Sequence, residues 1–156
     1  MIAALVIALL AATAVAGAGA LLTEIGTWYA ALRKPPWQPP DWLFGPAWTV
    51  IFALTAIAAA LGWQASGPER PRMVALFVVN GLLNILWSGL FFRLRRPDWA
   101  LAEVVPLWLS VLALVVDLAP VSAVAAWLLA PYLAWVAFAA FLNLTIVRLN
   151  APFPGR

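Results

Sequence analysis

Five long runs with almost no charged residue constrain the fold of this chain more than any other feature. Residues 1–23, 42–68, 73–92 and 118–147 contain no Asp, Glu, Lys or Arg, and residues 99–116 contain only Glu103. An α-helix needs about 20 consecutive apolar residues to cross the hydrocarbon core of a membrane. Strands of a membrane barrel would alternate apolar and polar residues, which these Ala-, Leu- and Val-rich runs do not do. The sequence therefore predicts an all-α integral membrane protein, a bundle of five transmembrane helices.

The predicted bundle is a single domain that covers residues 1–156. We expect its helices at about 2–22, 42–65, 72–93, 98–118 and 121–148, with a long loop at 23–41. Pro131 is expected to kink the last helix, because proline lacks a backbone hydrogen-bond donor. The first run resembles a signal peptide in one respect, the small residues 18–20, but it lacks a positively charged start. We expect this first helix to be retained.

The composition excludes several classes of function. Hydrophobic residues make up 66% of the chain and charged residues 10%, which an ordinary soluble enzyme of this length would not tolerate. The chain has neither Cys nor His, so disulfides, thiolate catalysis and imidazole metal ligands are excluded, and we expect no metal site. The sequence offers no dedicated acid–base pair, and we predict no catalytic residues for ordinary turnover. No basic run is long enough to favour a nucleic-acid partner.

Basic residues are distributed unequally between the two sides of the predicted bundle. The side that holds loop 23–41 and the C-terminus carries seven of them: Arg33, Lys34, Arg93, Arg95, Arg96, Arg148 and Arg156. The other side carries Arg70 and Arg72. The positive-inside rule therefore places the loop and the C-terminus in the cytoplasm and the N-terminus outside.

Three of the predicted helices carry aromatic, amide and small residues along one face. These stripes are Trp48, Phe52 and Thr55 in the second helix, Asn80, Asn84, Trp87, Ser88 and Phe91 in the third, and Trp135, Ala139 and Asn143 in the fifth. With a rise of about 1.5 Å per residue, the stripes converge in the half of the bundle nearer loop 23–41. A cavity lined by aromatic rings and a few amides, and covered by a loop, would suit an apolar ligand.

The same residues allow a simpler interpretation. Tryptophan is enriched at membrane interfaces, which accounts for Trp28, Trp37, Trp42 and Trp99. Asn and Ser within spans often serve only to hold helices together. Four prolines within residues 35–40 stiffen the loop, which then either caps a ligand or merely connects two helices. Periodicity alone leaves both interpretations open.

Three sequence motifs give information that periodicity does not. The first is Lys34-Pro35-Pro36-Trp37-Gln38-Pro39-Pro40-Asp41-Trp42 followed by Phe44-Gly45-Pro46-Ala47-Trp48-Thr49. The others are Asn84-Ile85-Leu86-Trp87 with Phe91-Phe92, and Pro131-Tyr132-Leu133-Ala134-Trp135 with Leu142-Asn143. Together they closely resemble the signatures of the TspO/MBR family, the tryptophan-rich sensory proteins related to the mitochondrial translocator protein (peripheral benzodiazepine receptor). The resemblance covers nearly the whole chain in a consistent order.

The resemblance implies a five-helix bundle, commonly a homodimer, that binds porphyrins such as protoporphyrin IX and haem in a pocket beneath the first loop. It implies ligand-binding roles for Trp48, Asn84, Trp87, Trp135, Ala139 and Asn143, with Trp37 in the lid. Phe52, on the same helical stripe as Trp48, is predicted to bind the ligand with them. Because no His or Cys can ligate haem iron, metal-free porphyrin is favoured, as a ligand rather than a cofactor. The propionates would reach Arg33 or Lys34. The resemblance to bacterial members implies a sensory protein located in the cell envelope, which regulates tetrapyrrole metabolism or a stress response.

The chain departs from the family pattern at two positions. Phe52 stands where a Tyr is common one turn after Trp48, so the pocket lacks one hydroxyl. Leu144 replaces the Tyr of a sterol-recognition pattern of which Leu142 and Arg148 remain, and we do not expect strong cholesterol binding.

Two other functions stay open. One is translocation of porphyrin or lipid-like ligands, although coupled transport has little support, since Glu103 is the only carboxylate within a predicted span and lies near the loop side. The other is light-dependent degradation of porphyrin, with Trp48 and Trp135 as redox partners. For a dimer, small residues offer two faces for close helix contact, one with Ala12, Ala16 and Ala20 and the other with Gly81 and Ser88.

Overall fold

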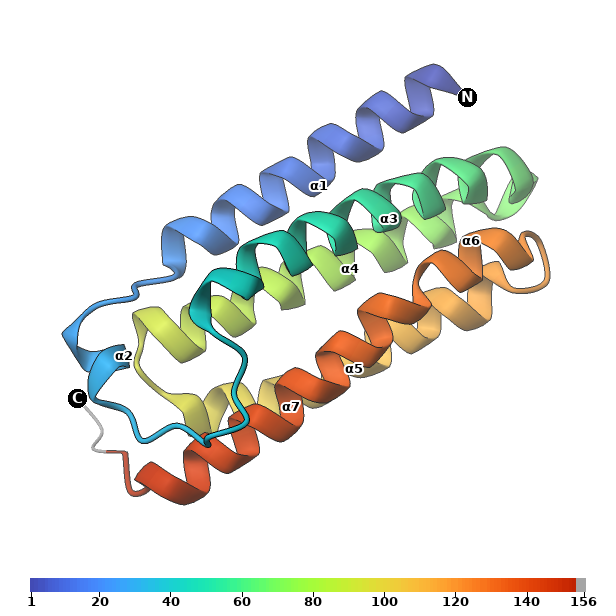
Figure 1. The fold of residues 1–156 in the computed structure, drawn as a ribbon. Coiled ribbons are helices and arrows are strands. Elements are labelled where there is room, and N and C mark those ends of the chain that lie inside the picture. Colours follow the sequence, from blue (N-terminus) through green and yellow to red (C-terminus); the bar gives the residue numbers. More distant parts are fainter. Residues whose placement is uncertain (154–156) are drawn as a thin grey trace.

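The computed structural model describes residues 1–153 as a set of helices that run along a common direction (Figure 1). The long helices are α1 (Ile2–Leu22), α3 (Phe44–Ala65), α4 (Arg70–Ser88), α5 (Pro97–Leu118) and α7 (Ala130–Asn150). The shorter elements are α2 (Thr27–Ala31), the 3₁₀ helices η1 (Asp41–Leu43) and η2 (Gly67–Glu69), the π-helical turn η3 (Gly89–Arg93) and α6 (Ala123–Leu128).

Five segments of the described chain are long and apolar enough to cross a membrane. They are Ile2–Leu22, Asp41–Ala65, Gly67–Arg93, Pro97–Leu118 and Ala123–Asn150. The prediction of an all-α membrane bundle with five spanning helices is confirmed. The last span is interrupted at Leu129, which ends α6 and precedes α7. Pro131 occupies the first turn of α7, where its missing donor is not needed, so the irregularity expected there is a break between two helices.

Most basic residues lie at the end of the bundle that holds α2, and few lie at the other end. The N-terminus lies at the same end as the connection between α3 and α4, whereas α2 and the end of α7 lie at the opposite end (Figure 1). Arg72, at the first of these ends, donates a 2.7 Å hydrogen bond to Asp117 Oδ1 and so links α4 to α5. Of the seven cations assigned to the loop side, Arg156 lies outside the described residues.

The end of the bundle farther from α2 is tightly packed. Its core consists of Ala58, Met73, Leu114, Leu118, Ala125, Ala126 and Leu129. Gly62 permits this packing, because a Cβ atom at that position would lie 2.6 Å from Leu118 Cδ2 and 2.8 Å from Met73 Sδ. The solid core leaves the opposite half of the bundle as the place where a cavity can form.

Helix α1 packs along α3 and α4, while α5 packs between α4 and α7. Two small residues of α4 allow the contact with α1. A Cβ atom on Gly81 would lie 3.0 Å from Val15 Cγ2, and Ser88 Oγ would lie 3.6 Å from a Cβ atom on Gly19. The face with Gly81 and Ser88, considered for a dimer contact, is therefore used within the chain.

Candidate functional site

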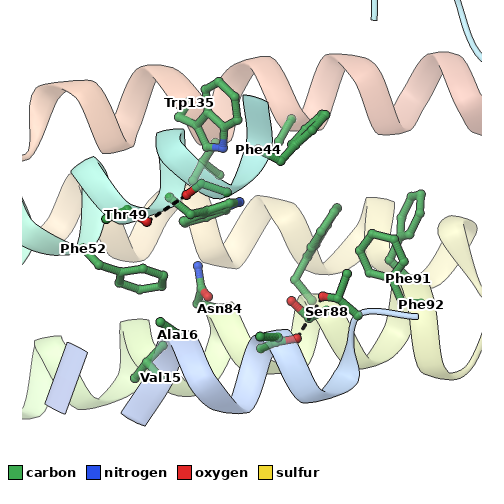
Figure 2. Close-up of a pocket in the computed structure, with 18 of the residues that line it drawn as sticks. Val15, Ala16, Phe44, Thr49, Phe52, Asn84, Ser88, Phe91, Phe92 and Trp135 are labelled. Carbon is green, nitrogen blue, oxygen red and sulfur yellow. Dashed lines mark hydrogen bonds between the residues drawn. The ribbon is translucent and has the colours of Figure 1, made fainter. Parts of the chain in front are cut away.

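A cavity of about 810 Å³ lies among α1, α3, α4, α5 and α7, in the half of the bundle nearer α2. Figure 2 shows residues of four of these helices around the space: Val15 and Ala16 of α1, Phe44, Thr49 and Phe52 of α3, Asn84 and Ser88 of α4, and Trp135 of α7. Pockets for small molecules commonly have volumes of about 300–1,000 Å³ and a mostly apolar lining. The size and the lining both suit an apolar small molecule.

Aromatic rings form much of the cavity wall. The Trp48 and Phe52 rings stack with centroids 5.4 Å apart, and the Trp87 and Phe91 rings stack at 5.1 Å. On the α7 side, the Trp135 ring meets Phe44 edge to face at 5.7 Å. These rings offer flat faces and edges to a planar ligand.

Small side chains of α1 form the wall opposite α7. Ala12, Ala16, Gly19 and Ala20 all border the cavity. The alanine spacing that suggested a helix contact instead creates room for a ligand. Larger side chains at these positions would fill the space.

The cavity contains few polar groups. Asn84 Nδ2 donates a 3.1 Å hydrogen bond to the hydroxyl of Tyr132, which fixes the amide between α4 and α7. Trp87 Nε1 is buried and finds no acceptor in the part of the chain that the structure describes. A buried donor without a partner is unfavourable, and because this nitrogen has almost no surface open to the cavity, it is a local cost to the fold.

Asn143 borders the cavity but has a structural partner. Its side chain is 1% exposed and its amide lies 3.0 Å from the Pro97 oxygen and 3.1 Å from the Leu101 nitrogen. Oriented to donate to the first and accept from the second, the amide ties α7 to the first turns of α5. Its hydrogen-bonding capacity is thus largely used by the protein.

A hydrogen-bonded network in the loop covers one end of the cavity. The Tyr29 hydroxyl donates to Asp41 Oδ1 at 3.0 Å, and Gln38 Nε2 lies 3.3 Å from both of these oxygens. All three side chains border the cavity. Burial, reinforced by the Asp41 carboxylate, raises the pKa of Tyr29 to about 12. Lys34 Nζ lies 3.7 Å from the centroid of the Tyr29 ring, a cation–π contact that places an ammonium group beside the network.

Two further contacts anchor the loop to the helices. Asn150 Oδ1 accepts a 2.8 Å hydrogen bond from the Arg33 nitrogen, while Asn150 Nδ2 donates to the Arg33 oxygen at 2.8 Å. Near the start of the loop, Glu24 forms an ion pair with Arg93 of η3. The loop is therefore fastened near its start and near its middle.

The structure places Trp37 outside the cavity. Its ring stacks on Phe141 of α7 with centroids 5.1 Å apart and meets Phe138 edge to face at 6.1 Å. Trp37 is not among the residues that border the cavity, whereas its neighbour Gln38 is. The prediction that Trp37 closes the pocket does not agree with this arrangement. The indole instead covers apolar rings on the flank of α7, and polar side chains form the lid.

The other seven predicted site residues border the cavity: Trp48, Phe52, Asn84, Trp87, Trp135, Ala139 and Asn143. Two members of the predicted stripes, Thr55 and Asn80, do not border it. Asn80 Nδ2 donates instead to Ser110 Oγ at 2.8 Å, which joins α4 to α5. Tyr29, Gln38 and Asp41 were not predicted as site residues, although polar side chains within an apolar, proline-rich stretch are a local signal of such a network.

Glu103 is buried on α5 outside the cavity. Its side chain is 7% exposed, and neither carboxyl oxygen has a hydrogen-bond partner among residues 1–153. The same described residues contain no cluster of three or more His, Cys, Asp or Glu side chains arranged to hold a metal ion.

Comparison with known proteins gives consistent matches over most of the chain. The profile of the TspO/MBR family matches residues 4–149. The tryptophan-rich protein TspO of Chlorobaculum tepidum is 43% identical over 141 residues, which cover 88% of this chain and 89% of that protein. Its counterpart in Archaeoglobus fulgidus is 40% identical over 149 residues (94% and 97%). The human translocator protein is 36% identical over 131 residues (82% and 78%).

Proposed function

The chain belongs to the TspO/MBR family, and on that premise we propose that it is a membrane receptor for porphyrins, of which protoporphyrin IX is the ligand to test. Relatives carry the names tryptophan-rich protein, CrtK and translocator protein, which support a sensory or translocator role in a membrane. Porphyrin binding would allow the protein to regulate tetrapyrrole metabolism or a stress response.

The observation that carries the proposal is the aromatic cavity beneath residues 23–41. A flat macrocycle would stack on rings that border the cavity, such as Trp48 and Trp135, and each aromatic pair contributes roughly 0.5–1.5 kcal/mol beyond the burial of apolar area. The cavity volume of about 810 Å³ lies within the range for molecules of this size.

The loop carries a positively charged side chain that would pair with the carboxylates of a porphyrin. Lys34 Nζ lies against Tyr29, which borders the cavity, so a propionate at that end would meet an ammonium group. Asp41 would repel the same propionate, but its Oδ1 already accepts hydrogen bonds from Tyr29 and Gln38. We therefore assign propionate contact to Lys34 ahead of Arg33, because the Lys34 ammonium lies beside a ring that borders the cavity.

Recognition is proposed to favour metal-free porphyrin over haem. The chain has no His or Cys. Its two tyrosines are both engaged, Tyr29 with Asp41 and Tyr132 with Asn84. Strong axial ligation of haem iron normally uses His, Cys, Met or Tyr. Binding through ring stacking and amide contacts does not need the metal.

We also propose a location and an assembly state. The location is a bacterial cell envelope, and in an inner membrane the charge bias places residues 23–41 in the cytoplasm and the N-terminus outside. The family resemblance favours a homodimer. Because Gly81 packs against α1, a second copy would have to use a face other than that of Gly81 and Ser88.

The experiment is a tryptophan-fluorescence titration of the purified protein with protoporphyrin IX. The proposal predicts saturable quenching with one ligand per chain, and weaker binding in Trp87→Leu, which removes an aromatic ring that borders the cavity. A control variant, Trp127→Phe, alters a side chain that is 76% exposed and does not border the cavity. Linear, non-saturating quenching would contradict the proposal.

One observation keeps light-dependent chemistry as a second candidate. Trp48 and Trp135 both border the cavity, so a bound porphyrin would contact two oxidisable indoles. Illumination of the complex should then yield new absorption bands that weaken in Trp48→Phe and Trp135→Phe. Unchanged product formation in both variants would show that the two tryptophans are not the redox partners.

A further inference from the structure

Two hollows of the structure meet at one side chain. Besides the cavity beneath the loop, a groove of about 490 Å³ lies between α3 and α7. The groove is lined by Pro46, Ala47, Val50, Ile51, Pro131, Ala134, Trp135 and Phe138. Trp135 is the one residue that borders both hollows within the described chain. The indole is thus part of the wall between them.

We propose that this seam between α3 and α7 is a lateral portal, through which an apolar planar ligand passes between the bilayer and the cavity. Trp135 is the side chain that gates it. The inference rests on the proposed function, because it concerns the route of the same ligand. It adds a path and a gate that the receptor role does not specify.

The seam is the most weakly joined part of the cavity wall. Helix α1 packs closely along α3, and α5 packs closely against both α4 and α7, but α3 and α7 make few contacts. Two aromatic pairs cross the seam, Phe44 with Trp135 at 5.7 Å and Trp48 with Tyr132 at 5.9 Å. Figure 2 shows Trp135 of α7 beside Phe44 of α3. Among the described residues, no hydrogen bond joins the two helices across this seam.

Small residues on the outer side of the seam leave room for a ligand to approach the gate. Ala47 and Ala134 line the groove without bordering the cavity. A ligand in the groove would therefore lie against Trp135 before any side chain of the cavity floor. A change of the Trp135 rotamer would exchange ring contacts for ligand contacts without breaking a directional bond.

The opposite route, beneath the loop, is held by directional bonds. Tyr29, Gln38 and Asp41 are hydrogen-bonded to one another, and Asn150 makes two bonds to the backbone of Arg33. Opening this side would break several of these bonds together. A hydrophobic macrocycle is concentrated in the bilayer rather than in water, so the route that starts in the bilayer also has the higher ligand concentration.

The test compares two alanines of α7. Ala134 lines the groove only, whereas Ala137 is exposed on the same helix and lines neither hollow. With the protein in lipid nanodiscs and protoporphyrin IX as the probe, stopped-flow tryptophan quenching gives the association and dissociation rates. Ala134→Phe should slow both rates about ten-fold, a barrier increase of about 1.4 kcal/mol, and leave Kd unchanged, because a blocked path affects both directions equally. Ala47→Phe tests the same seam from α3.

The alternative outcomes are distinct. Unchanged rates in Ala134→Phe and Ala47→Phe, or an equal slowing in Ala137→Phe, would overturn the portal while saturable binding kept the receptor role intact. Acceleration of both rates by Asn150→Ala would show passage beneath the loop and would also overturn the portal. Absence of saturable binding in the unmodified protein would overturn the receptor role and the portal with it.

Discussion

Asn150 at the end of α7 holds the backbone of Arg33, 117 residues earlier in the chain, through two hydrogen bonds of 2.8 Å each. The side-chain amide accepts from the Arg33 nitrogen and donates to its oxygen, so it satisfies both backbone groups of one loop residue. This clamp, together with the network around Tyr29, makes the loop an ordered lid rather than a mere connector.

Removal of the clamp should loosen the loop. In Asn150→Ala, both backbone groups of Arg33 lose their partner, at about 1 kcal/mol for each hydrogen bond. We expect faster deuterium exchange in residues 24–40 with little change in α4 and α5. The matched control is Thr145→Ala, which removes only a bond to Phe141 within α7. Equal exchange in the two variants would show that Asn150 does not hold the loop.

The loop should also respond to alkaline pH. The pKa of Tyr29 in the folded protein is about 12, above the usual value of 10.0, because burial and the Asp41 carboxylate disfavour the phenolate. A raised folded-state pKa stabilises the folded loop below pH 10, and this contribution is lost as the pH rises through 12. The loop should therefore open, and its deuterium exchange accelerate, above pH 10.

Absorbance near 295 nm would follow this ionisation directly. The chain has two tyrosines, so Tyr132→Phe leaves Tyr29 as the sole titrating phenol. We expect a midpoint near 12, and a lower midpoint after Asp41→Asn, still above the usual value because burial remains. A midpoint near 10 in both proteins would mean that Tyr29 is solvated and that the network does not form.

Glu103 and Asp117 of α5 should behave in opposite ways when made apolar. Neither oxygen of Glu103 finds a partner in the described part of the chain, and a buried polar group without one costs about 1–3 kcal/mol. Glu103→Leu should therefore raise the midpoint of thermal unfolding in detergent. Asp117→Leu should lower it slightly, because Asp117 pairs with Arg72 at 2.7 Å and the arginine is largely exposed. A large loss of stability in Glu103→Leu would show that the carboxyl has a partner.

A glycine substitution in the packed end of the bundle, with a second glycine in α1 as its control, tests the packing. Gly62→Ala should destabilise the protein by about 1–3 kcal/mol, because the new methyl group would overlap Leu118 and Met73. Gly17→Ala places its methyl where no atom lies within 4 Å, and should be neutral or stabilising by up to about 1 kcal/mol. Thermal unfolding in the same detergent gives both values, and similar shifts would contradict the packing around Gly62.

The helices and most of the cavity wall were predictable because the relevant signals are local. A membrane span shows itself as an uncharged run, and the spacing of Trp135, Ala139 and Asn143 places them on one helix face whatever surrounds the helix. The long apolar runs thus predicted all five spans that the structure contains.

The role of each residue within those faces depends on which helices become neighbours, and the sequence does not contain that information locally. From the sequence, Asn143 is predicted to contact a ligand. In the fold, α5 places Pro97 and Leu101 beside it, and they take up its hydrogen bonds. From the sequence, the alanines of α1 are predicted to form a close helix contact. In the fold, these alanines border the cavity. Trp37 lies on a loop, where periodicity gives no direction, and only the fold places it against Phe141.

The central claim, that the aromatic cavity is the porphyrin site, is tested most directly by filling it from α1. Ala16 borders the cavity, whereas Ala14 is exposed on the same helix and does not. The measurement is the Kd for protoporphyrin IX in Ala16→Phe and Ala14→Phe, with unfolding midpoints to confirm that both are folded. We predict that Ala16→Phe weakens binding at least about ten-fold, equivalent to 1.4 kcal/mol, and that Ala14→Phe binds like the unmodified protein. Equal Kd values in all three folded proteins would place the porphyrin elsewhere and contradict the account.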